Sequence, residues 1–309
     1  MFAGTFTAIV TPFKDGQVDE AAFRKLIELQ VEGGVEGFVP VGTTGESPTL
    51  DSDEHLEVLR IAVDAAAGRI LVVAGTGANS TSEAIYLTEA AEKLGVDASL
   101  QVTPYYNKPS QEGLYQHFKA IANSTELPIM LYSVPGRSVV ALAPETAGRL
   151  ANDCDNILSI KEAGGDPART DLLKAALPDG FPILSGDDPL TIEFMKRGAC
   201  GLVSVASNII PRAMSDLVRA MNAGEVEKAE AIHNEYVELM ETLMGLETNP
   251  VPIKEAVALM GLCEHEIRLP LVGLSEEKLA TVKALLEKYN FYKDLRYQFF
   301  DTHFLKYCL

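Results

Sequence analysis

Short apolar runs alternate with longer amphipathic stretches along most of the chain. The runs are rich in Val, Ile and Phe and are bounded by turn residues, a pattern typical of buried strands. We expect strands at residues 6–13, 37–41, 70–74, 98–102, 128–134, 157–163, 181–184 and 201–206. The stretches between them carry apolar residues at helical spacing, often after a capping Asp or Ser or at a first-turn Pro. We expect helices at residues 19–33, 51–67, 80–94, 110–123, 166–177, 189–197 and 210–221, and a short helix that starts at Pro144.

This order gives eight strand–helix units in succession, with no interrupting block. Strands that alternate with helices form a parallel sheet. Eight such units fit a closed (β/α)8 barrel, the TIM-barrel architecture of the α/β class. An open, doubly wound sheet is the competing fold, but no Gly-x-Gly-x-x-Gly motif follows the first expected strand. We therefore predict a (β/α)8 catalytic barrel over residues 1–223.

The chain beyond residue 223 follows a different pattern. Residues 224–289 predict three helices, at 225–244, 252–260 and 275–288, which would form a C-terminal helical appendage on the barrel. The last segment, residues 290–309, is rich in aromatic residues. It holds seven of the chain's 22, namely Phe291, Tyr292, Tyr297, Phe299, Phe300, Phe304 and Tyr307. We expect this C-terminal extension to lie on the surface of its own or a neighbouring subunit, because exposed aromatic clusters often mark a contact.

Composition narrows the classes of function. The chain has 309 residues and a formal net charge of −18, so it lacks the basic surface that nucleic-acid binding needs. The overall field repels anions, so an anionic substrate must be held by specific local groups. The four cysteines are far apart and predict reduced thiols. The first residues lack the features of a signal peptide, and no apolar run is long enough to span a membrane. We expect a cytoplasmic protein that binds neither nucleic acid nor membrane.

Polar residues gather where the expected strands end. In a (β/α)8 barrel the active site lies at the carboxyl ends of the strands. The residues expected on that face are Thr11, Thr43, Thr44, Tyr106, Tyr132, Arg137, Lys161, Asp187 and Ser207. No set of metal ligands accompanies them, because the five histidines are scattered over expected helices and the tail. We therefore expect no metal and no cofactor.

Lys161 lies inside the apolar run of residues 157–163. Strand side chains alternate, so Lys161 shares a face with Ile157 and Ser159. One interpretation is a lysine at a strand end whose ammonium reaches solvent. The other is an amine that forms a Schiff base with a carbonyl substrate. That chemistry needs partial burial, because a free lysine with a pKa of about 10.4 is protonated at neutral pH. The strand alone leaves both interpretations open.

Four motifs resemble those of one family of enzymes. They are Gly42-Thr43-Thr44-Gly45-Glu46-Ser47, Thr103-Pro104-Tyr105-Tyr106-Asn107, Tyr132-Ser133-Val134-Pro135-Gly136-Arg137 and Ile160-Lys161-Glu162-Ala163. In this order, over residues 2–288, the chain resembles the dihydrodipicolinate synthase family. The first motif alone resembles the wider superfamily of pyruvate-dependent class I aldolases, which includes N-acetylneuraminate lyase. The resemblance implies a carbon–oxygen lyase, 4-hydroxy-tetrahydrodipicolinate synthase, which condenses pyruvate with L-aspartate 4-semialdehyde in diaminopimelate and lysine biosynthesis.

The resemblance also implies the catalytic roles. Lys161 would form the Schiff base with pyruvate, and Tyr132 would donate and accept protons. Thr43 would link Tyr132 to Tyr106 in a proton relay. In this family the second tyrosine comes from a neighbouring subunit, which implies a homo-oligomer, usually a dimer of dimers. Ser133 stands where the family usually has Asn, but its side chain should face away from Tyr132, so we expect little loss.

Substrate binding is implied for three further residues. Thr44 would hold the pyruvate carboxylate, and Val203 would line the same pocket. Arg137 would bind the carboxylate of aspartate 4-semialdehyde, which a guanidinium matches with two parallel hydrogen bonds. A second Ile-Lys-Glu-Ala sequence occurs at residues 253–256 and opens an expected helix. We interpret its Lys254 as structural.

Inhibition by lysine is a further hypothesis. In family members that lysine inhibits, the effector site lies at the subunit interface. The residues that match that site are Ser47, His55, Asn79, Glu83 and Tyr105. The set includes a carboxylate for the ammonium of the effector, although Pro48 and Ser52 depart from common forms. Ordinary polar residues of an interface are the alternative interpretation.

Two other functions stay open at this point. A sugar-acid aldolase or lyase could use the same barrel, although Arg137 within Val-Pro-Gly-Arg argues against it. A non-catalytic binding or assembly protein could also keep the fold. Such a protein would have no need of the intact candidate set, which comprises Lys161, Tyr132, Thr43, Thr44 and Tyr106.

Overall fold

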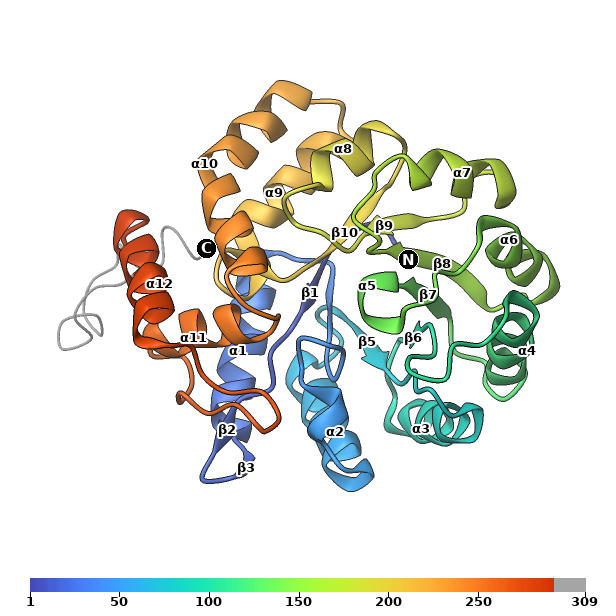
Figure 1. The fold of residues 1–309 in the computed structure, drawn as a ribbon, viewed down its shortest axis with the longest axis horizontal. Coiled ribbons are helices and arrows are strands. Elements are labelled where there is room, and N and C mark those ends of the chain that lie inside the picture. Colours follow the sequence, from blue (N-terminus) through green and yellow to red (C-terminus); the bar gives the residue numbers. More distant parts are fainter. Residues whose placement is uncertain (292–309) are drawn as a thin grey trace.

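The computed structural model describes residues 1–291, which form a closed barrel of eight parallel strands with helices around it (Figure 1). The barrel strands are β1 (Gly4–Ala8), β4 (Gly37–Val39), β5 (Leu71–Gly75), β6 (Ala98–Val102), β7 (Ile129–Ser133), β8 (Ile157–Glu162), β9 (Ile183–Ser185) and β10 (Gly201–Ser204). Neighbouring strands follow the order β1-β10-β9-β8-β7-β6-β5-β4, and β1 also pairs with β4, which closes the barrel. The predicted (β/α)8 fold is confirmed.

Helices connect the strands and cover the outside of the barrel (Figure 1). They are α1 (Glu20–Gly33), α2 (Ser52–Ala66), α3 (Thr81–Leu94), α4 (Gln111–Ala122), α6 (Pro144–Asp153), α7 (Arg169–Ala176), α8 (Thr191–Lys196) and α9 (Pro211–Asn222). Side chains of Asp19, Asp51 and Ser110 cap α1, α2 and α4 by accepting backbone N–H groups of the first turns. These local signals explain why the predicted helices are found at nearly the predicted residues.

The first strand is shorter than predicted. The prediction was one strand over residues 6–13, but β1 ends at Ala8, and a separate antiparallel hairpin follows, made of β2 (Phe13–Lys14) and β3 (Gln17–Val18). Beyond Ala8 the backbone leaves the ladder: the N–H of Val10 is bound by the Asn208 side chain at 3.1 Å, and Pro12 has no N–H to offer a strand. Three short helices were also not predicted: η1 (Ser47–Thr49), α5 (Pro135–Ser138) and η2 (Ala206–Asn208).

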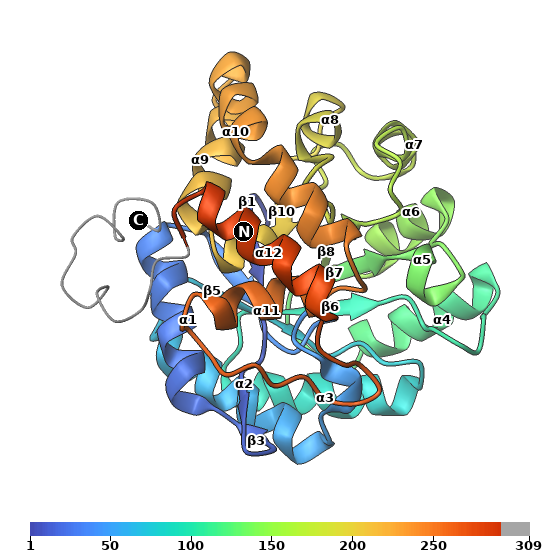
Figure 2. The same ribbon diagram turned by 60° about the vertical axis from the view of Figure 1, so that its left-hand side comes forward.

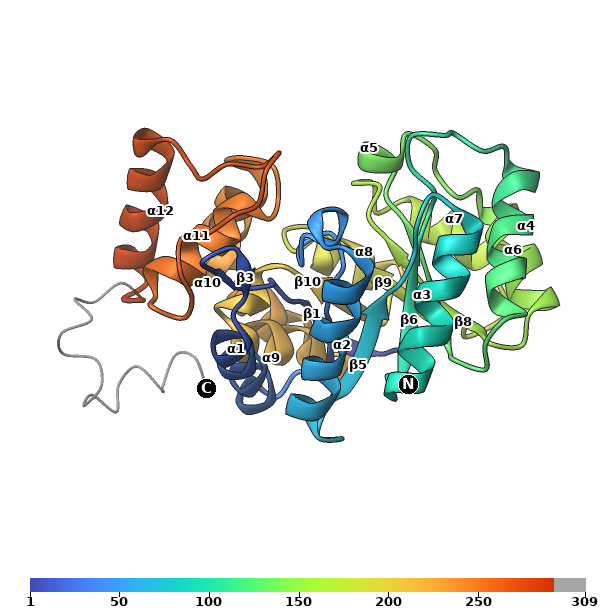
Figure 3. The same ribbon diagram turned by 90° about the horizontal axis from the view of Figure 1, so that it is seen from below.

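Three helices follow the barrel, as predicted for the C-terminal appendage: α10 (Val226–Gly245), α11 (Val251–Leu259) and α12 (Glu276–Lys288). Every residue of α11 is buried, and Figure 2 shows α12 lying across it. Figure 3 shows that the connection from α11 to α12 lies at the same end of the barrel as α5, which follows β7. The division into separate domains at residue 223 stays a prediction, and residues 292–309 of the predicted extension lie outside the described residues.

No helix within residues 1–291 is both long enough and apolar enough to cross a membrane.

Asn208 joins the ends of β1 and β10, the first and the last strand of the barrel along the chain. It is fully buried in η2, just after β10. Its Oδ1 accepts the N–H of Val10 at 3.1 Å, and its Nδ2 donates to the carbonyl groups of Ala8 and Val205 at 2.8 and 2.9 Å. These backbone groups lie at or beyond strand ends, so the side-chain amide supplies hydrogen bonds where the ladder stops.

We therefore expect Asn208→Ala to lower the free energy of unfolding by about 2–4 kcal/mol, because buried backbone groups lose their partners. Urea denaturation followed by circular dichroism measures this. Asn222→Ala is the control, since Asn222 is exposed and makes one hydrogen bond, to the Cys200 carbonyl at 3.1 Å. An equal, small change in both variants would contradict the proposed role of Asn208 in joining β1 to β10.

Candidate active site

A cavity of about 400 Å³ lies at the carboxyl ends of the strands. Six of the nine residues predicted for this face line it, namely Thr43, Thr44, Tyr132, Arg137, Lys161 and Asp187. They come from the segments after β4 and β9, from β7 and β8, and from α5. Residues distant in the sequence therefore meet because parallel strands all end at the same rim.

Lys161 and Tyr132 lie side by side in this cavity. The register of β7 against β8 pairs the two residues directly. The Lys161 Nζ lies 4.1 Å from the centroid of the Tyr132 ring. Lys161 is only 6% exposed, which does not fit the interpretation of a lysine that reaches solvent. The amine is sheltered from bulk water and open to the cavity, as a Schiff-base lysine requires.

The neighbouring strand residues face the other way, as alternation requires. Ser133 is fully buried, and its Oγ accepts the N–H of Leu142 at 3.3 Å, so it is turned away from Tyr132 as predicted. Glu162 is also fully buried and pairs with Arg169, with 3.1 Å between Oε2 and Nε. Burial raises the pKa of the Glu162 carboxyl, and the charge of Arg169 opposes this shift.

Thr44 and Arg137 are held by one residue that the sequence analysis missed. The Nδ2 of Asn249 donates to the Thr44 Oγ1 at 3.0 Å, and the Asn249 carbonyl accepts from an Arg137 Nη at 2.9 Å. Asn249 lines the cavity and lies in the segment between α10 and α11. Its Oδ1 is buried and has no hydrogen-bond partner within the described chain. The only sequence signal was a polar residue in the Asn249-Pro250 turn, which by itself names no partner.

The remaining predicted residues lie outside the cavity lining. Thr11 is buried and donates to the Gly45 carbonyl at 2.7 Å, so it supports the loop that carries Thr43 and Thr44. Ser207 is buried and donates within its own turn. Val203 is buried on β10 without lining the cavity, whereas Val205 does line it.

Tyr106 is 88% exposed and lines none of the cavities described here. It follows β6 and has a left-handed backbone, with φ of 71°. This conformation is uncommon for a residue with a side chain. Its predicted partner, Thr43, lines the cavity with Lys161. Within one chain the two residues therefore do not share a site.

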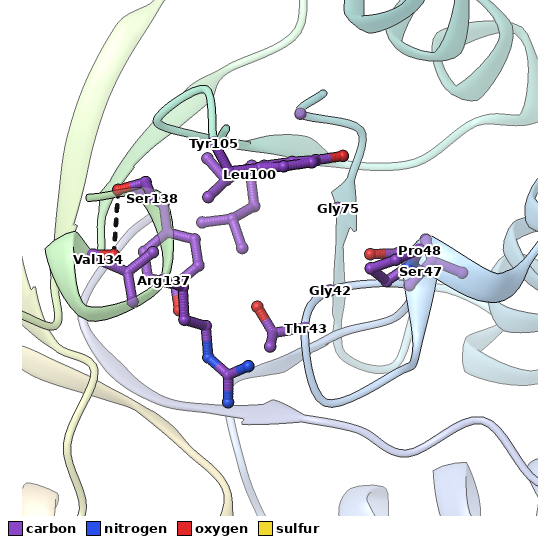
Figure 4. Close-up of a pocket in the computed structure, with 14 residues that line it drawn as sticks. Gly42, Thr43, Ser47, Pro48, Gly75, Leu100, Tyr105, Val134, Arg137 and Ser138 are labelled. Carbon is purple, nitrogen blue, oxygen red and sulfur yellow. Dashed lines mark hydrogen bonds between the residues drawn. The ribbon is translucent and has the colours of Figure 1, made fainter. Parts of the chain in front are cut away.

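A smaller cavity of about 230 Å³ continues from the first one, and Thr43, Tyr132 and Arg137 line both. Figure 4 shows Thr43 between Arg137 on one side and the Ser47–Pro48 segment on the other. The α5 turn that presents Arg137 is closed by a hydrogen bond from the Ser138 Oγ to the Val134 carbonyl at 3.1 Å, drawn as a dashed line in Figure 4. The wall of this cavity is mainly apolar apart from these groups.

Known proteins resemble this chain over nearly its whole length. A model described as the dihydrodipicolinate synthetase family matches residues 1–289. The chain belongs to that family. It is 49% identical to the 4-hydroxy-tetrahydrodipicolinate synthase of Trichlorobacter lovleyi, over 94% of this chain and 99% of that protein.

Two solved structures show the same likeness. The dihydrodipicolinate synthase of Aquifex aeolicus superposes with a TM-score of 0.92 at 44% identity, over 94% of this chain and 99% of that one. The chloride-inhibited enzyme of Acinetobacter baumannii, solved in complex with pyruvate, superposes with a TM-score of 0.91 at 46% identity, over 94% and 100%. These comparisons confirm the predicted family, the predicted synthase function and the predicted enzyme class, a lyase of the class I aldolase type.

The residues predicted to bind lysine as an inhibitor also share a cavity. It has a volume of about 320 Å³, and its lining includes Ser47, His55, Asn79, Glu83 and Tyr105. His55 is the most buried of them, and its Nε2 has no hydrogen-bond partner among the described residues. Burial lowers the pKa of His55 to about 4, so the imidazole is neutral at pH 7. Burial and the nearby Glu83 carboxylate raise the pKa of Tyr105, which keeps its hydroxyl protonated.

The lowered pKa of His55 gives a pH-dependent stability. Between its unfolded value of 6.5 and its folded value of about 4, the unfolded chain binds a proton that the folded protein excludes. This contribution to stability is therefore present above pH 6.5 and is lost as the pH falls through 4. The free energy of unfolding of wild type should therefore fall by about 2 kcal/mol between pH 7 and pH 5 because of His55.

We expect His55→Gln to remove that loss, because glutamine does not titrate. Urea denaturation of both proteins at pH 7 and pH 5 gives the difference between them, in which the other titrating groups cancel. Relative to wild type, the free energy of unfolding of the variant should be about 2 kcal/mol more favourable at pH 5 than at pH 7. A difference that stays the same at both pH values would show that His55 accepts its proton normally in the folded state.

Proposed function

We propose that this chain carries out the synthase reaction through a Schiff base between Lys161 and pyruvate, with L-aspartate 4-semialdehyde as the second substrate. The observation that carries the proposal is the buried Lys161 amine against the Tyr132 ring, 4.1 Å from Nζ to the centroid, in a cavity that Arg137 also lines. The pyruvate complex of the Acinetobacter baumannii enzyme supports the choice of the first substrate.

The proposed chemistry begins at the ketone of pyruvate. The Lys161 amine attacks the ketone carbon, and water leaves, so that an iminium forms. The iminium withdraws electrons from the adjacent methyl group, which then loses a proton and becomes an enamine. The enamine carbon attacks the aldehyde carbon of the second substrate and forms the new carbon–carbon bond. The amino group of the second substrate then displaces Lys161 and closes the ring.

Tyr132 suits the proton transfers in this sequence. It is the one phenol of the described chain that lines the cavity together with Lys161. A side chain in direct contact with the amine can take protons from the reacting atoms and return them, which contributes about 10²–10⁴-fold to the rate of such reactions. Thr43 lines the same cavity and would pass protons to Tyr106 of a neighbouring subunit.

Two residues would hold the anionic substrates despite the negative charge of the chain, which repels anions. Thr44 would bind the pyruvate carboxylate through its backbone N–H and hydroxyl. Arg137 would bind the carboxylate of aspartate 4-semialdehyde, because the guanidinium offers paired donors. The Asn249 contacts support both roles, since they hold the Thr44 hydroxyl and the Arg137 guanidinium beside the cavity.

The assembly that we propose is a homo-oligomer, a dimer of dimers. The exposure of Tyr106 supports it, because this tyrosine lies outside the cavity of its own chain. An exposed aromatic side chain in a fixed backbone conformation is suited to insertion into a neighbour. A cytoplasmic location, in which the thiols stay reduced, also stays a prediction.

We expect purified wild type to turn over pyruvate and aspartate 4-semialdehyde, measured as NADPH oxidation by a coupling reductase. Lys161→Ala should abolish turnover, and Tyr132→Phe should lower kcat by about 10²–10⁴-fold. Tyr86→Phe is the matched control, since Tyr86 is exposed on α3, and it should keep wild-type kcat. Cleavage of N-acetylneuraminate or a keto-deoxy sugar acid instead would favour the sugar-acid lyase, and no turnover of any of these would favour the binding protein.

We also propose that L-lysine binds in the cavity lined by Glu83 and His55 and inhibits the enzyme. The carboxylate of Glu83 would pair with the ammonium, and the unpartnered His55 Nε2 offers a neutral acceptor. Glu83→Gln should raise the lysine concentration that gives half inhibition at least tenfold. This corresponds to a loss of about 1.4 kcal/mol in the free energy of lysine binding. Glu89→Gln, on the same helix but outside the cavity lining, should leave it unchanged. Wild type whose rate at subsaturating pyruvate does not respond to excess L-lysine would contradict the proposal.

A further inference from the structure

The loop that carries Thr43 and Thr44 is held in an unusual backbone conformation. The residues that bracket it, Val41 and Glu46, both lie in the left-handed region, with φ of 48° and 56°. This region is uncommon for residues with side chains, and a β-branched residue such as valine is a clear outlier there. Such conformations persist where the surroundings hold them, and they cluster at functional sites. The shape of this loop therefore depends on contacts from outside it.

Glu46 makes two of those contacts. Its side chain is 2% exposed and lines none of the cavities described above. Its Oε1 is bound by the Nζ of Lys254, from α11, in a buried ion pair. Its Oε2 accepts the backbone N–H of Arg268 at 3.1 Å. Both carboxylate oxygens are thus satisfied by the C-terminal segment.

Lys254 is committed to this contact. It is 1% exposed, and its Nζ lies 4.1 Å from the centroid of the Phe13 ring. Burial lowers the pKa of Lys254, and the Glu46 carboxylate opposes that shift. A buried ion pair adds little net stability over an apolar pair of similar size, because desolvation offsets the attraction. Its value here lies in geometry, since the pair fixes where the loop sits relative to α11.

The same C-terminal segment holds the loop at a second point. Asn249, just before α11, donates to the Thr44 Oγ1 at 3.0 Å. Two residues of one loop, Thr44 and Glu46, are therefore tied to α11 and its N-terminal turn. Thr43 precedes Thr44 in the chain, and its carbonyl accepts the N–H of Glu46 at 3.1 Å, so its position follows theirs.

We propose that the buried pair of Glu46 and Lys254 is a positioning device for the active site. It holds the loop so that Thr44 presents its N–H and hydroxyl to the pyruvate carboxylate and Thr43 faces Tyr132. Neither Glu46 nor Lys254 reaches the cavity, so both act through the loop and neither is a catalytic residue. This inference rests on the proposed function of Thr43 and Thr44. It also assigns the second Ile-Lys-Glu-Ala sequence, at residues 253–256, a role beyond structure.

The test compares Glu46→Gln, Lys254→Met and the double variant with Val282→Ala. Val282 is fully buried on α12, so its truncation destabilises the appendage without touching the loop. Thermal melts first establish a temperature at which every protein stays folded. Steady-state kcat and the KM for each substrate are then measured at that temperature. We expect both single variants to lose at least tenfold in kcat/KM for pyruvate, because a displacement of about 1 Å can cost about 10²-fold in rate.

The double variant separates positioning from stability. It contains no unpaired buried charge, so its melting temperature should recover relative to the single variants. Its kcat/KM for pyruvate should stay at least tenfold below wild type, because the loop has lost its anchor. Val282→Ala should keep wild-type kcat/KM despite a lower melting temperature.

Three outcomes would overturn the inference. Single variants with kcat/KM for pyruvate within twofold of wild type would show that the loop keeps its shape unaided. Activity that recovers with stability in the double variant, or that falls equally in Val282→Ala, would make the role purely structural. If Lys254→Met does not fold, the test rests on the kinetics of Glu46→Gln, because glutamine keeps the shape of the glutamate side chain. A wild type without synthase turnover would overturn the proposed function and this inference together, whereas an active wild type with unaffected variants overturns this inference alone.

Discussion

The register between β7 and β8 is the constraint on which the active site depends. It pairs Tyr132 with Lys161, so an amine and a phenol meet inside the barrel mouth. Because strand side chains alternate between faces, a slip of one residue would turn Lys161 outward and bring Glu162 inward. All five residues of β7 and five of the six residues of β8 are buried, so a slip would displace buried side chains on both faces of the strands. The position of Lys161 in the cavity is thus a consequence of how the core packs.

The fold could be predicted from the sequence because the signals that specify each strand and helix are local. Each strand–helix unit carries its own apolar run and turn residues, and eight such units in succession fit a closed parallel barrel. Lys161, Tyr132, Thr43, Thr44 and Arg137 were predictable for two reasons. Their motifs resemble those of a known family, and strand ends in a barrel converge. Val203 did not line the cavity, because its strand ends just beyond it and Val205 takes that place.

What could not be predicted depends on contacts between distant parts of the chain. Asn249 reaches Thr44 across 205 positions, and Lys254 reaches Glu46 across 208. No periodicity or spacing connects such residues. Lys254 was interpreted as structural from its helix alone, and its burial against a catalytic loop appears only in three dimensions. The early end of β1 involves a distant contact as well, because the Asn208 side chain binds the backbone of Ala8 and Val10. The C-terminal segment therefore forms part of the cavity wall, through Met244, Thr248 and Asn249.

Reductive trapping of pyruvate tests the central claim most directly. Sodium borohydride is added to wild type with pyruvate, and the modified peptide is identified by mass spectrometry, with Lys161→Arg as the control that keeps a cation in the cavity. The account predicts one reduced pyruvyl adduct, on the peptide that contains Lys161, and none in the variant. Folded wild type that gains no adduct with pyruvate in excess, or that carries it on another lysine, would contradict the Schiff-base mechanism.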